Sequence, residues 1–294
     1  MHRKRRRWRG PPLIQLLRSL AKNRTLLRSF VARDLKARYV GSSLGFFWSV
    51  VYPIMNLAVY MVVFQIILKA SWPLKSSQEV VLHMLVAIVA WSAVAEAISR
   101  STNVLVENQN LIEKVVFPSE ILPAYITISA MINMIIALPI VLAALAWAML
   151  LPSADSVALA EQTGSAGVQL GLNLAWLPVL LVLQAVFTVG IGYFLATFNL
   201  FWRDTFHVIG VALTVWMFTT PIFYAPTMMV DAGYGWLLAI NPMHWLMDMY
   251  RNVLVRDAAP DPAYLVAFAI AGVVTLSVGA TFFRSQRARF PDLF

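Results

Sequence analysis

Six long apolar runs constrain this chain more than any other feature of its sequence. A helix needs roughly 20 apolar residues to cross about 30 Å of hydrocarbon. Runs suited to this cover residues 46–68, 80–98, 121–151, 172–201, 205–224 and 263–283. With a mean hydropathy of +0.72 and only 13% charged residues, the chain has more apolar surface than one soluble core would bury. The sequence predicts an all-α, polytopic membrane protein whose six transmembrane helices form one domain, residues 26–294.

Positive charge is unevenly distributed among the connections between these runs. With both termini inside, nineteen of the 23 Lys and Arg fall on the cytoplasmic side, 13 of them before residue 45, and four fall outside. Short loops rich in Lys and Arg stay inside, so we expect cytoplasmic termini and a basic leader over residues 1–25. A cleaved signal is not expected, because the first apolar run starts only near residue 46. The net charge of +9 follows this topology, and we expect no nucleic-acid partner.

Residues 26–45 are expected to form an amphipathic interfacial helix. One helical face carries Leu27, Phe30, Val31 and Leu35, whereas the cations lie mostly elsewhere: Arg28, Arg33, Lys36 and Arg38. This segregation suits a helix in the inner headgroup layer, with its cations on anionic lipid. A solvated helix preceding the first span is the alternative interpretation.

The segment 225–262 is too interrupted to span a bilayer. Asn241 and Pro242 separate two apolar stretches of about ten residues each, a length typical of segments that enter a membrane and return. We therefore expect re-entrant outer helices with Pro242 at their bend. An amphipathic loop on the outer leaflet fits the pattern equally well.

A short polar segment, residues 107–117, separates the second and third runs. Leu111, Ile112 and Val115 repeat at helical spacing among polar residues, and Pro118 ends the helix. A helix this short is not stable alone in water. Its apolar face must lie against the membrane or fit a groove on a soluble partner.

The sequence offers little chemistry of its own. It has no G-x-x-x-x-G-K-[ST] loop for ATP, so a partner that hydrolyses ATP is the simplest source of energy. It has no cysteine, and few ionisable residues stand in or near the spans: His83, Glu96 and His207. His244 and Asp248 share a helical face, but a zinc site needs a third ligand. We expect no catalytic, cofactor-binding or metal-binding residue in this chain.

Aromatic residues are concentrated within and at the ends of the apolar runs. Trp and Tyr belts at the two interfaces account for most of them. Aromatic faces also stack on sugar rings, so a row of them offers a sequence-tolerant contact to a moving glycan. Composition alone favours the belts for most of these residues.

Four motifs together resemble one family. RDLKARYVGSSLGFFWSVVYP (33–53), ENQNLIEKVVFPSEILP (107–123), FNLFWRDT (198–205) and NPMHWLMDMYRNVL (241–254) are similar to segments of the membrane subunits of bacterial type-two ABC exporters for polysaccharides. These are the O-antigen, capsule and teichoic-acid permeases. The motifs occur in the family's order across nearly the whole chain.

The resemblance implies a homodimer of six-helix subunits that exports a lipid-linked glycan across the bacterial inner membrane. Each subunit would dock on a separate nucleotide-binding subunit that binds ATP and Mg²⁺, so this chain would be a transport subunit and no enzyme. Coupling to that ATPase is implied for Glu107, Asn108, Asn110, Leu111, Ile112, Glu113, Lys114 and Val115. The interfacial entrance of the glycan is implied for Arg33, Asp34, Lys36, Arg38 and Tyr39. Its path is implied for Trp48, Tyr52, Trp216, Phe218 and Tyr224, and an outer gate for Asn241, Pro242, His244, Trp245 and Tyr250.

Other functions fit parts of the same pattern. A polytopic membrane enzyme acting on lipid-linked sugars would use His244 and Asp248, and a proton-coupled carrier would depend on Glu96. Export of a small lipid or drug is a further alternative. The basic leader and the outer loop 152–172 are longer than the family core requires, and the loop is a candidate contact for periplasmic export components.

Overall fold

The computed structural model describes residues 12–39, 47–69, 72–73, 75–114, 117–163 and 168–293. Within these ranges the chain is helical apart from short connections, with no β-strand and one isolated bridge between Gln169 and Arg256. Four of the helices described are long and apolar enough to cross a membrane: Ser77–Glu107, Ile121–Leu150, Leu172–Phe201 and Pro262–Phe290. Two shorter apolar helices, Val51–Ile67 and Thr205–Thr219, fall in the other two expected spans. The all-α, polytopic fold class is confirmed.

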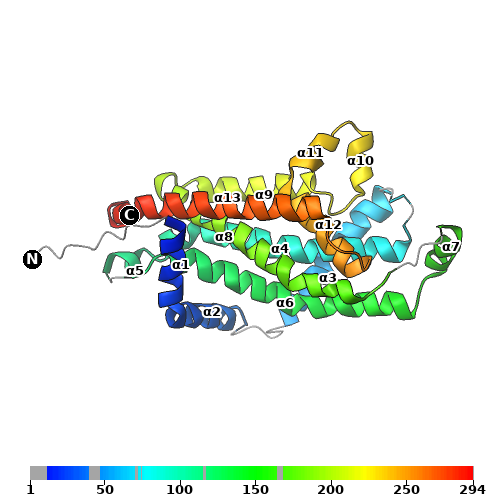
Figure 1. The fold of residues 1–294 in the computed structure, drawn as a ribbon, viewed down its shortest axis with the longest axis horizontal. Coiled ribbons are helices and arrows are strands. Elements are labelled where there is room, and N and C mark those ends of the chain that lie inside the picture. Colours follow the sequence, from blue (N-terminus) through cyan, green and yellow to red (C-terminus); the bar gives the residue numbers. More distant parts are fainter. Residues whose placement is uncertain are drawn as a thin grey trace, which may run out of the picture.

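The long helices run side by side along the longest axis of the molecule (Figure 1). They are α4 (Ser77–Glu107), α6 (Ile121–Leu150), α8 (Leu177–Phe201), which follows the 3₁₀ turn η3 (Leu172–Trp176), α9 (Thr205–Thr219) and α13 (Pro262–Gln286). One end of the bundle carries α1 (Pro12–Lys22), α5 (Gln109–Lys114) and the C-terminal turn η4 (Arg287–Asp292), and we call it the terminal end. The opposite end carries α7 (Ala154–Thr163).

Helix α4 forms the centre of the bundle. It packs against α6, α8, α12 (Pro242–Val255), α3 (Trp48–Met61) and α9. Most of its middle section is buried, including Met84, Ala87, Ala90 and Val94 at 0% exposure. The small side chains let neighbouring backbones approach closely, as is usual between membrane helices.

Helices α8 and α13 form the most extensive helix pair and cross at two glycines. A Cβ atom built on Gly279 would lie 2.1 Å from the carbonyl oxygen of Gly190, and one built on Gly190 would lie 2.4 Å from the backbone nitrogen of Leu276. The backbones therefore touch where a side chain would separate them. This contact holds the C-terminal helix against the bundle.

The interfacial segment forms helix α2 (Arg24–Tyr39), and residues 40–46 of the expected 26–45 helix lie outside the described residues. Its apolar face is covered by protein, because Phe30 and Val31 are 7% and 8% exposed and α2 packs against α6. Leu27 and Leu35 are half-buried beside them. Its exposed cations, Arg28 and Lys36 among them, face away from this contact.

The segment 225–262 forms three helices, α10 (Pro226–Asp231), α11 (Gly235–Ile240) and α12. Helices α10 and α11 project from the bundle, whereas α12 lies within it (Figure 1). Pro242 is the first residue of α12, and the Asn241 side chain accepts the amide hydrogen bond of Met243, at 3.0 Å. Asn241 and Pro242 thus mark the bend between α11 and α12, because Asn caps helices and Pro suits the first helical turn.

Helices α3 and α9 keep exposed apolar faces. Helix α3 contains Pro53 and continues into the π-helical turn η2 (Val62–Ile67), while only Thr205 of α9 is buried. Met55 and Val59 of α3 are 55% and 59% exposed, and Val211 of α9 is 67% exposed. Most residues of these two helices are therefore not covered by the rest of the described chain.

Candidate functional site

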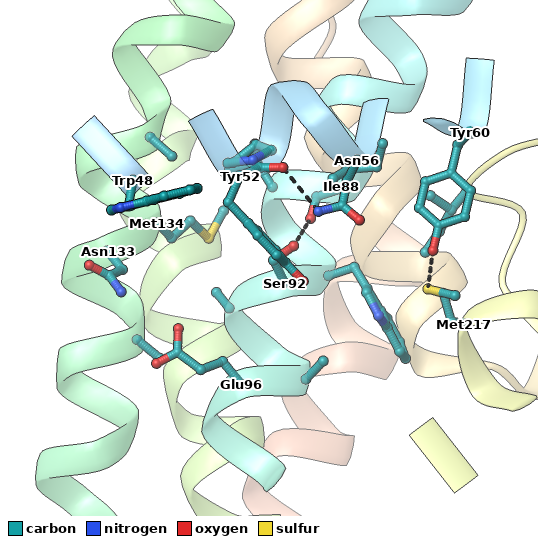
Figure 2. A pocket seen from close by; sticks show the side chains of 18 of the residues that line it. Trp48, Tyr52, Asn56, Tyr60, Ile88, Ser92, Glu96, Asn133, Met134 and Met217 are labelled. Atoms are coloured by element: carbon teal, nitrogen blue, oxygen red, sulfur yellow. Dashed lines mark hydrogen bonds between the residues drawn. The ribbon is translucent and has the colours of Figure 1, made fainter. Parts of the chain in front are cut away.

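A cavity of about 580 Å³ lies between α3, α4, α6 and the turn that follows α9. Helix α3 contributes Trp48, Tyr52, Asn56 and Tyr60 to its lining, which recur at every fourth residue and so share one helical face. Tyr52 points from α3 towards Ser92 of α4 (Figure 2). The cavity is thus lined along one wall by aromatic rings and a carboxamide.

Helix α4 supplies the facing wall with a second stripe at the same spacing. Ile88, Ser92 and Glu96 line the cavity, and Trp91 adds an aromatic ring. The Ser92 hydroxyl donates to the Ile88 carbonyl at 2.7 Å, which fixes its position on the helix. Helix α6 contributes Asn133 and Met134. A mixed lining of rings, hydroxyl and carboxamide groups suits a ligand that is polar at its edges and apolar on its faces.

Aromatic rings close the cavity on the side of the turn after α9. The rings of Tyr60 and Phe223 stack with centroids 3.9 Å apart, and Phe64 stacks on Phe223 at 5.1 Å. The Tyr60 hydroxyl also lies 3.9 Å from the sulfur of Met217 (Figure 2). Phe223 itself is 1% exposed. Offset stacking of this kind adds about 0.5–1.5 kcal/mol per pair.

Four charges join α2 to α4 beside the cavity. Arg38, which lines the cavity, pairs with Glu96, and its Nε lies 3.3 Å from Oδ2 of Asp34. Arg100 pairs with Asp34 and places Nη1 3.1 Å from Oε1 of Glu96. Burial alone would raise the pKa of Asp34, but the hydrogen bond and charge of Arg100, with the charge of Arg38, hold that pKa below its ordinary value. The two helices are therefore tied by a closed network of alternating charge.

The five aromatics expected along a glycan path divide into two groups. Trp48 and Tyr52 line the cavity. Trp216 stands behind the wall, with its ring 5.8 Å from Trp91 and its indole nitrogen donating to Asn241 at 3.0 Å. Phe218 is 45% exposed, and the hydroxyl of Tyr224 donates to its carbonyl at 2.6 Å. The structure thus brings two of the five to the cavity.

The expected gate residues lie at or near the base of α12 and help to fix it in the bundle. Asn241 donates to the Thr220 hydroxyl at 3.0 Å, and the buried Tyr250 donates to Gln184 of α8 at 2.7 Å. His244 is 5% exposed, and Trp245 stacks on Tyr264 with centroids 6.5 Å apart. These contacts bind α12 to the core of the bundle.

The expected entrance residues are partly engaged. The guanidinium carbon of Arg33 lies 4.4 Å above the Phe30 ring, Lys36 is exposed, and the side chain of Tyr39 lies outside the described residues. Asp34 and Arg38 belong to the charged network. Two of these residues therefore connect α2 to the cavity wall.

The expected coupling residues lie on both sides of the point where helix α4 ends and helix α5 begins. Glu107 ends α4, Asn108 donates back to the Val104 carbonyl at 2.8 Å, and α5 begins at Gln109. Leu111 and Ile112 are half-buried against the packed core of the terminal end. Four polar side chains of this set are exposed: Glu107, Asn110, Glu113 and Lys114. Val115 lies outside the described residues.

One buried charge was not anticipated from the sequence. Arg251 of α12 is 2% exposed and donates to the backbone carbonyls of His83 at 3.3 Å, Pro221 at 2.8 Å and Ile222 at 3.3 Å. Its guanidinium also lies 5.7 Å from the Trp72 ring. This side chain ties α12 to α4 and to the turn beside the cavity. Arg251 lies within the quoted motif 241–254, but its burial was not predicted, because its hydrogen-bonding partners are backbone groups.

Sequence reasoning also missed most of the polar cavity lining. Asn56, Ser92 and Asn133 line the cavity but were not singled out. The signal was present as period-four spacing with Trp48 and Tyr52 along α3. Among the residues described, no group of three or more His, Asp or Glu is placed to hold a metal.

The long apolar helices, with a lined cavity among them, are those expected of a multi-pass membrane protein. The sequence pattern of the ABC-2 type transporter family matches residues 25–255, and the chain belongs to this family. An O-antigen export system permease protein RfbA from Myxococcus xanthus is 29% identical over 285 residues, covering 95% of this chain and 99% of the relative. Two proteins of the same name from Klebsiella pneumoniae are 24% and 23% identical, each over 91% of this chain and 94% of its own length.

Proposed function

We propose that this chain is the permease subunit of an ATP-driven exporter that moves a polysaccharide, carried on a lipid, across the bacterial inner membrane. The observation that carries the proposal is the likeness over 95% of the chain to a protein named as an O-antigen export permease. In this proposal ATP and Mg²⁺ are bound by two separate nucleotide-binding subunits, and this chain has no catalytic role.

The chemistry of the cavity supports a carbohydrate cargo. Sugar rings present apolar C–H faces and hydroxyl edges. Tyr52, Trp91 and Ser92 offer matching aromatic rings and a hydroxyl group in the lining of the same cavity. The two charged lining residues, Arg38 and Glu96, are paired with each other.

The exposed sides of α3 and α9 support a homodimer. Both helices are apolar, and Tyr52, which lines the cavity from α3, is 59% exposed. A second copy placed against this side would enlarge the cavity into a path between two subunits. The excess of Lys and Arg in the loops at the terminal end supports cytoplasmic termini.

The alternatives are less well supported. Glu96, which a proton-coupled carrier would use, is paired with Arg38 and Arg100. His244 and Asp248, which a membrane enzyme would use, share no hydrogen bond in the structure, and Asp248 accepts instead from Asn252 at 3.3 Å. The relatives' names give no support to a small lipid or drug as cargo.

The proposal is tested by co-expression with the candidate ATPase subunit and by measuring glycan at the cell surface. Exchanging the exposed pair in the variant Glu113→Lys/Lys114→Glu keeps net charge but reverses the docking pattern on α5. We expect the amount of co-purified ATPase to fall by roughly tenfold, because complementary charges at the edge of an interface fix the register of the two partners. The matched control Glu161→Lys, on exposed α7 at the opposite end, should leave it unchanged. Full assembly and export in the charge-exchanged variant would refute docking through α5.

A further inference from the structure

Glu120 is a fully buried carboxylate at the point where the segment after α5 enters α6. Its side chain is 0% exposed, and it directly precedes Ile121, the first residue of α6. Carboxylates are seldom buried unless they are paired, because burial removes their hydration. The chain therefore places a carboxylate that is unfavourable to bury between α5 and the start of α6.

Two arginines from the other end of the sequence hold this carboxylate. Arg287 of η4 pairs with Oε1 of Glu120, and Nη1 of Arg284, near the end of α13, lies 3.7 Å from the same oxygen. Arg284 also donates to the Gln15 side chain of α1 at 2.6 Å. One carboxylate thus connects the base of α6 to both terminal helices.

The backbone of Glu120 makes a third connection. Its carbonyl accepts a hydrogen bond of 2.6 Å from the hydroxyl of Tyr193, a residue of α8 that is 0% exposed. The ring of Tyr193 lies 5.1 Å from that of Phe283, which lies 5.1 Å from Phe290 of η4. These rings cover the Glu120 side of the cluster, whereas the side chains of Arg287 and Arg284 keep 39% and 20% exposure. The low local dielectric around the buried carboxylate strengthens ion pairs that are already formed.

The neighbouring elements show why this cluster matters for motion. Helix α5 has six residues and is joined to α4 through the break at Asn108. Through the chain alone, displacement of α5 reaches only α4 and α6. Helix α5 also packs directly against η4, which continues α13. The connections to α8 and α1 run through Tyr193 and Arg284, which meet at Glu120.

We infer that Glu120 is a positioning residue that passes movement of α5 to α8, α13 and α1, so that the bundle responds as one body when the ATPase subunit closes. This inference rests on the proposed function, since it requires an ATPase docked at α5. Breaking the cluster should uncouple hydrolysis from export without preventing assembly. A group that served only the stability of the fold would lower both activities together.

The first test compares export per ATP hydrolysed in the complete complex. Glu120→Gln keeps the shape of the side chain and removes its charge. We expect normal co-purification of the ATPase, retained ATP hydrolysis and a loss of export per ATP of roughly tenfold, within the usual range of coupling between sites. Asp155→Asn is the matched control, because Asp155 accepts from the Ser77 amide at 2.8 Å at the opposite end. Its export per ATP should equal that of wild type.

The double variant Glu120→Gln/Arg287→Gln separates a shared role from two independent ones. If both side chains act through one pair, the double variant should lose no more coupling than the worse single variant. Multiplied losses would overturn the assignment of Arg287 as the partner that transmits the movement.

A second measurement keeps Glu120 intact and does not depend on a variant's folding. The chain has no natural cysteine, so spin labels can be placed at Gln109→Cys on α5, which is partly exposed and outside the expected coupling set, and at the exposed Arg289→Cys on η4. We expect their separation to stay constant between the nucleotide-free and ATP-bound complex. A change of more than about one helical turn, ~5 Å, would show that α5 moves independently of η4 and would overturn the inference.

The outcomes distinguish the inference from the function on which it rests. A wild-type protein that neither binds an ATPase nor exports glycan would remove both. A wild-type protein that does both, beside a Glu120→Gln variant with unchanged export per ATP, would overturn the inference alone.

Discussion

The glycine crossing between α8 and α13 allows a sharp test of how the bundle is packed. Gly272 and Gly279 stand seven residues apart on α13, so both face α8. A Cβ at Gly272 would meet Val186 at 3.5 Å and the Phe187 nitrogen at 3.6 Å, which are ordinary contacts. A Cβ at Gly279 would lie 2.1 Å from the backbone oxygen of Gly190. The same change to alanine should therefore have opposite effects at the two positions.

The magnitudes follow from these distances. At Gly279 the helices must separate by more than about 1 Å, and a gap of that size forfeits a quarter to a half of each dispersion contact along the seam. Overpacking of this kind costs about 3 kcal/mol, from which the higher helix propensity of alanine subtracts ~1 kcal/mol. Gly272→Ala keeps only the favourable part. At roughly 2–4 °C per kcal/mol, we expect apparent melting temperatures to fall by about 4–8 °C for Gly279→Ala and to rise by about 2–4 °C for Gly272→Ala.

Fluorescence-detected size-exclusion chromatography after heating measures both variants in the same detergent. Gly210→Ala on α9 is a further control, because nothing lies within 4 Å of its added Cβ. Equal melting temperatures for Gly272→Ala and Gly279→Ala would refute the close backbone contact at Gly190. Because Arg284 on α13 and Arg287 on η4 follow Gly279 along the chain, the destabilised variant should also lose contact with Glu120.

Three other perturbations have defined outcomes. Burial, and secondly the nearby charge of Arg256, lower the pKa of Lys75 to about 8 in the folded protein. Above that pH the unfolded chain binds more protons than the folded one, so the melting temperature of the wild type should rise from pH 8 to 10. The variant Lys75→Gln should abolish that rise. Phe223→Ala removes a ring stacked on Tyr60, so we expect a loss of about 3–5 kcal/mol and faster dye leakage from proteoliposomes. Arg251→Lys should lower the melting temperature nearly as much as Arg251→Met, because one ammonium cannot replace a fork directed at three carbonyls; full rescue by lysine would contradict this.

The membrane helices were predictable because their signal is local. A charge-free run such as residues 121–151 has few alternatives to a spanning helix, and α6 occupies nearly the same residues. The covering of α2 was not predictable in this way. An apolar face with Phe30 and Val31 fits lipid and a neighbouring helix equally well, because both are apolar, and here α6 covers it.

The site was only partly predictable because its walls come from different helices. Trp48 and Tyr52 were identified through the motif that contains them, whereas Ser92 and Asn133 are ordinary residues until α3, α4 and α6 are brought together. Arg251 looks from the sequence like a loop cation. Its burial depends on backbone carbonyls exposed at a turn, and sequence patterns do not report such groups.

Helix α4 relates the cavity to both ends of the bundle. It runs unbroken for 31 residues, or about 46 Å, without a glycine or proline. Along it lie the break at Asn108 beside α5, Glu96 and Ser92 at the cavity, and the His83 carbonyl that holds Arg251 of α12. The neighbouring α3 differs, because Pro53 and the π-turn η2 give it the usual sites of bending. If an ATPase subunit docks at α5 as proposed, a push there would shift the cavity wall formed by α4 together with α12 and the rest of the bundle, and bending would be confined to α3.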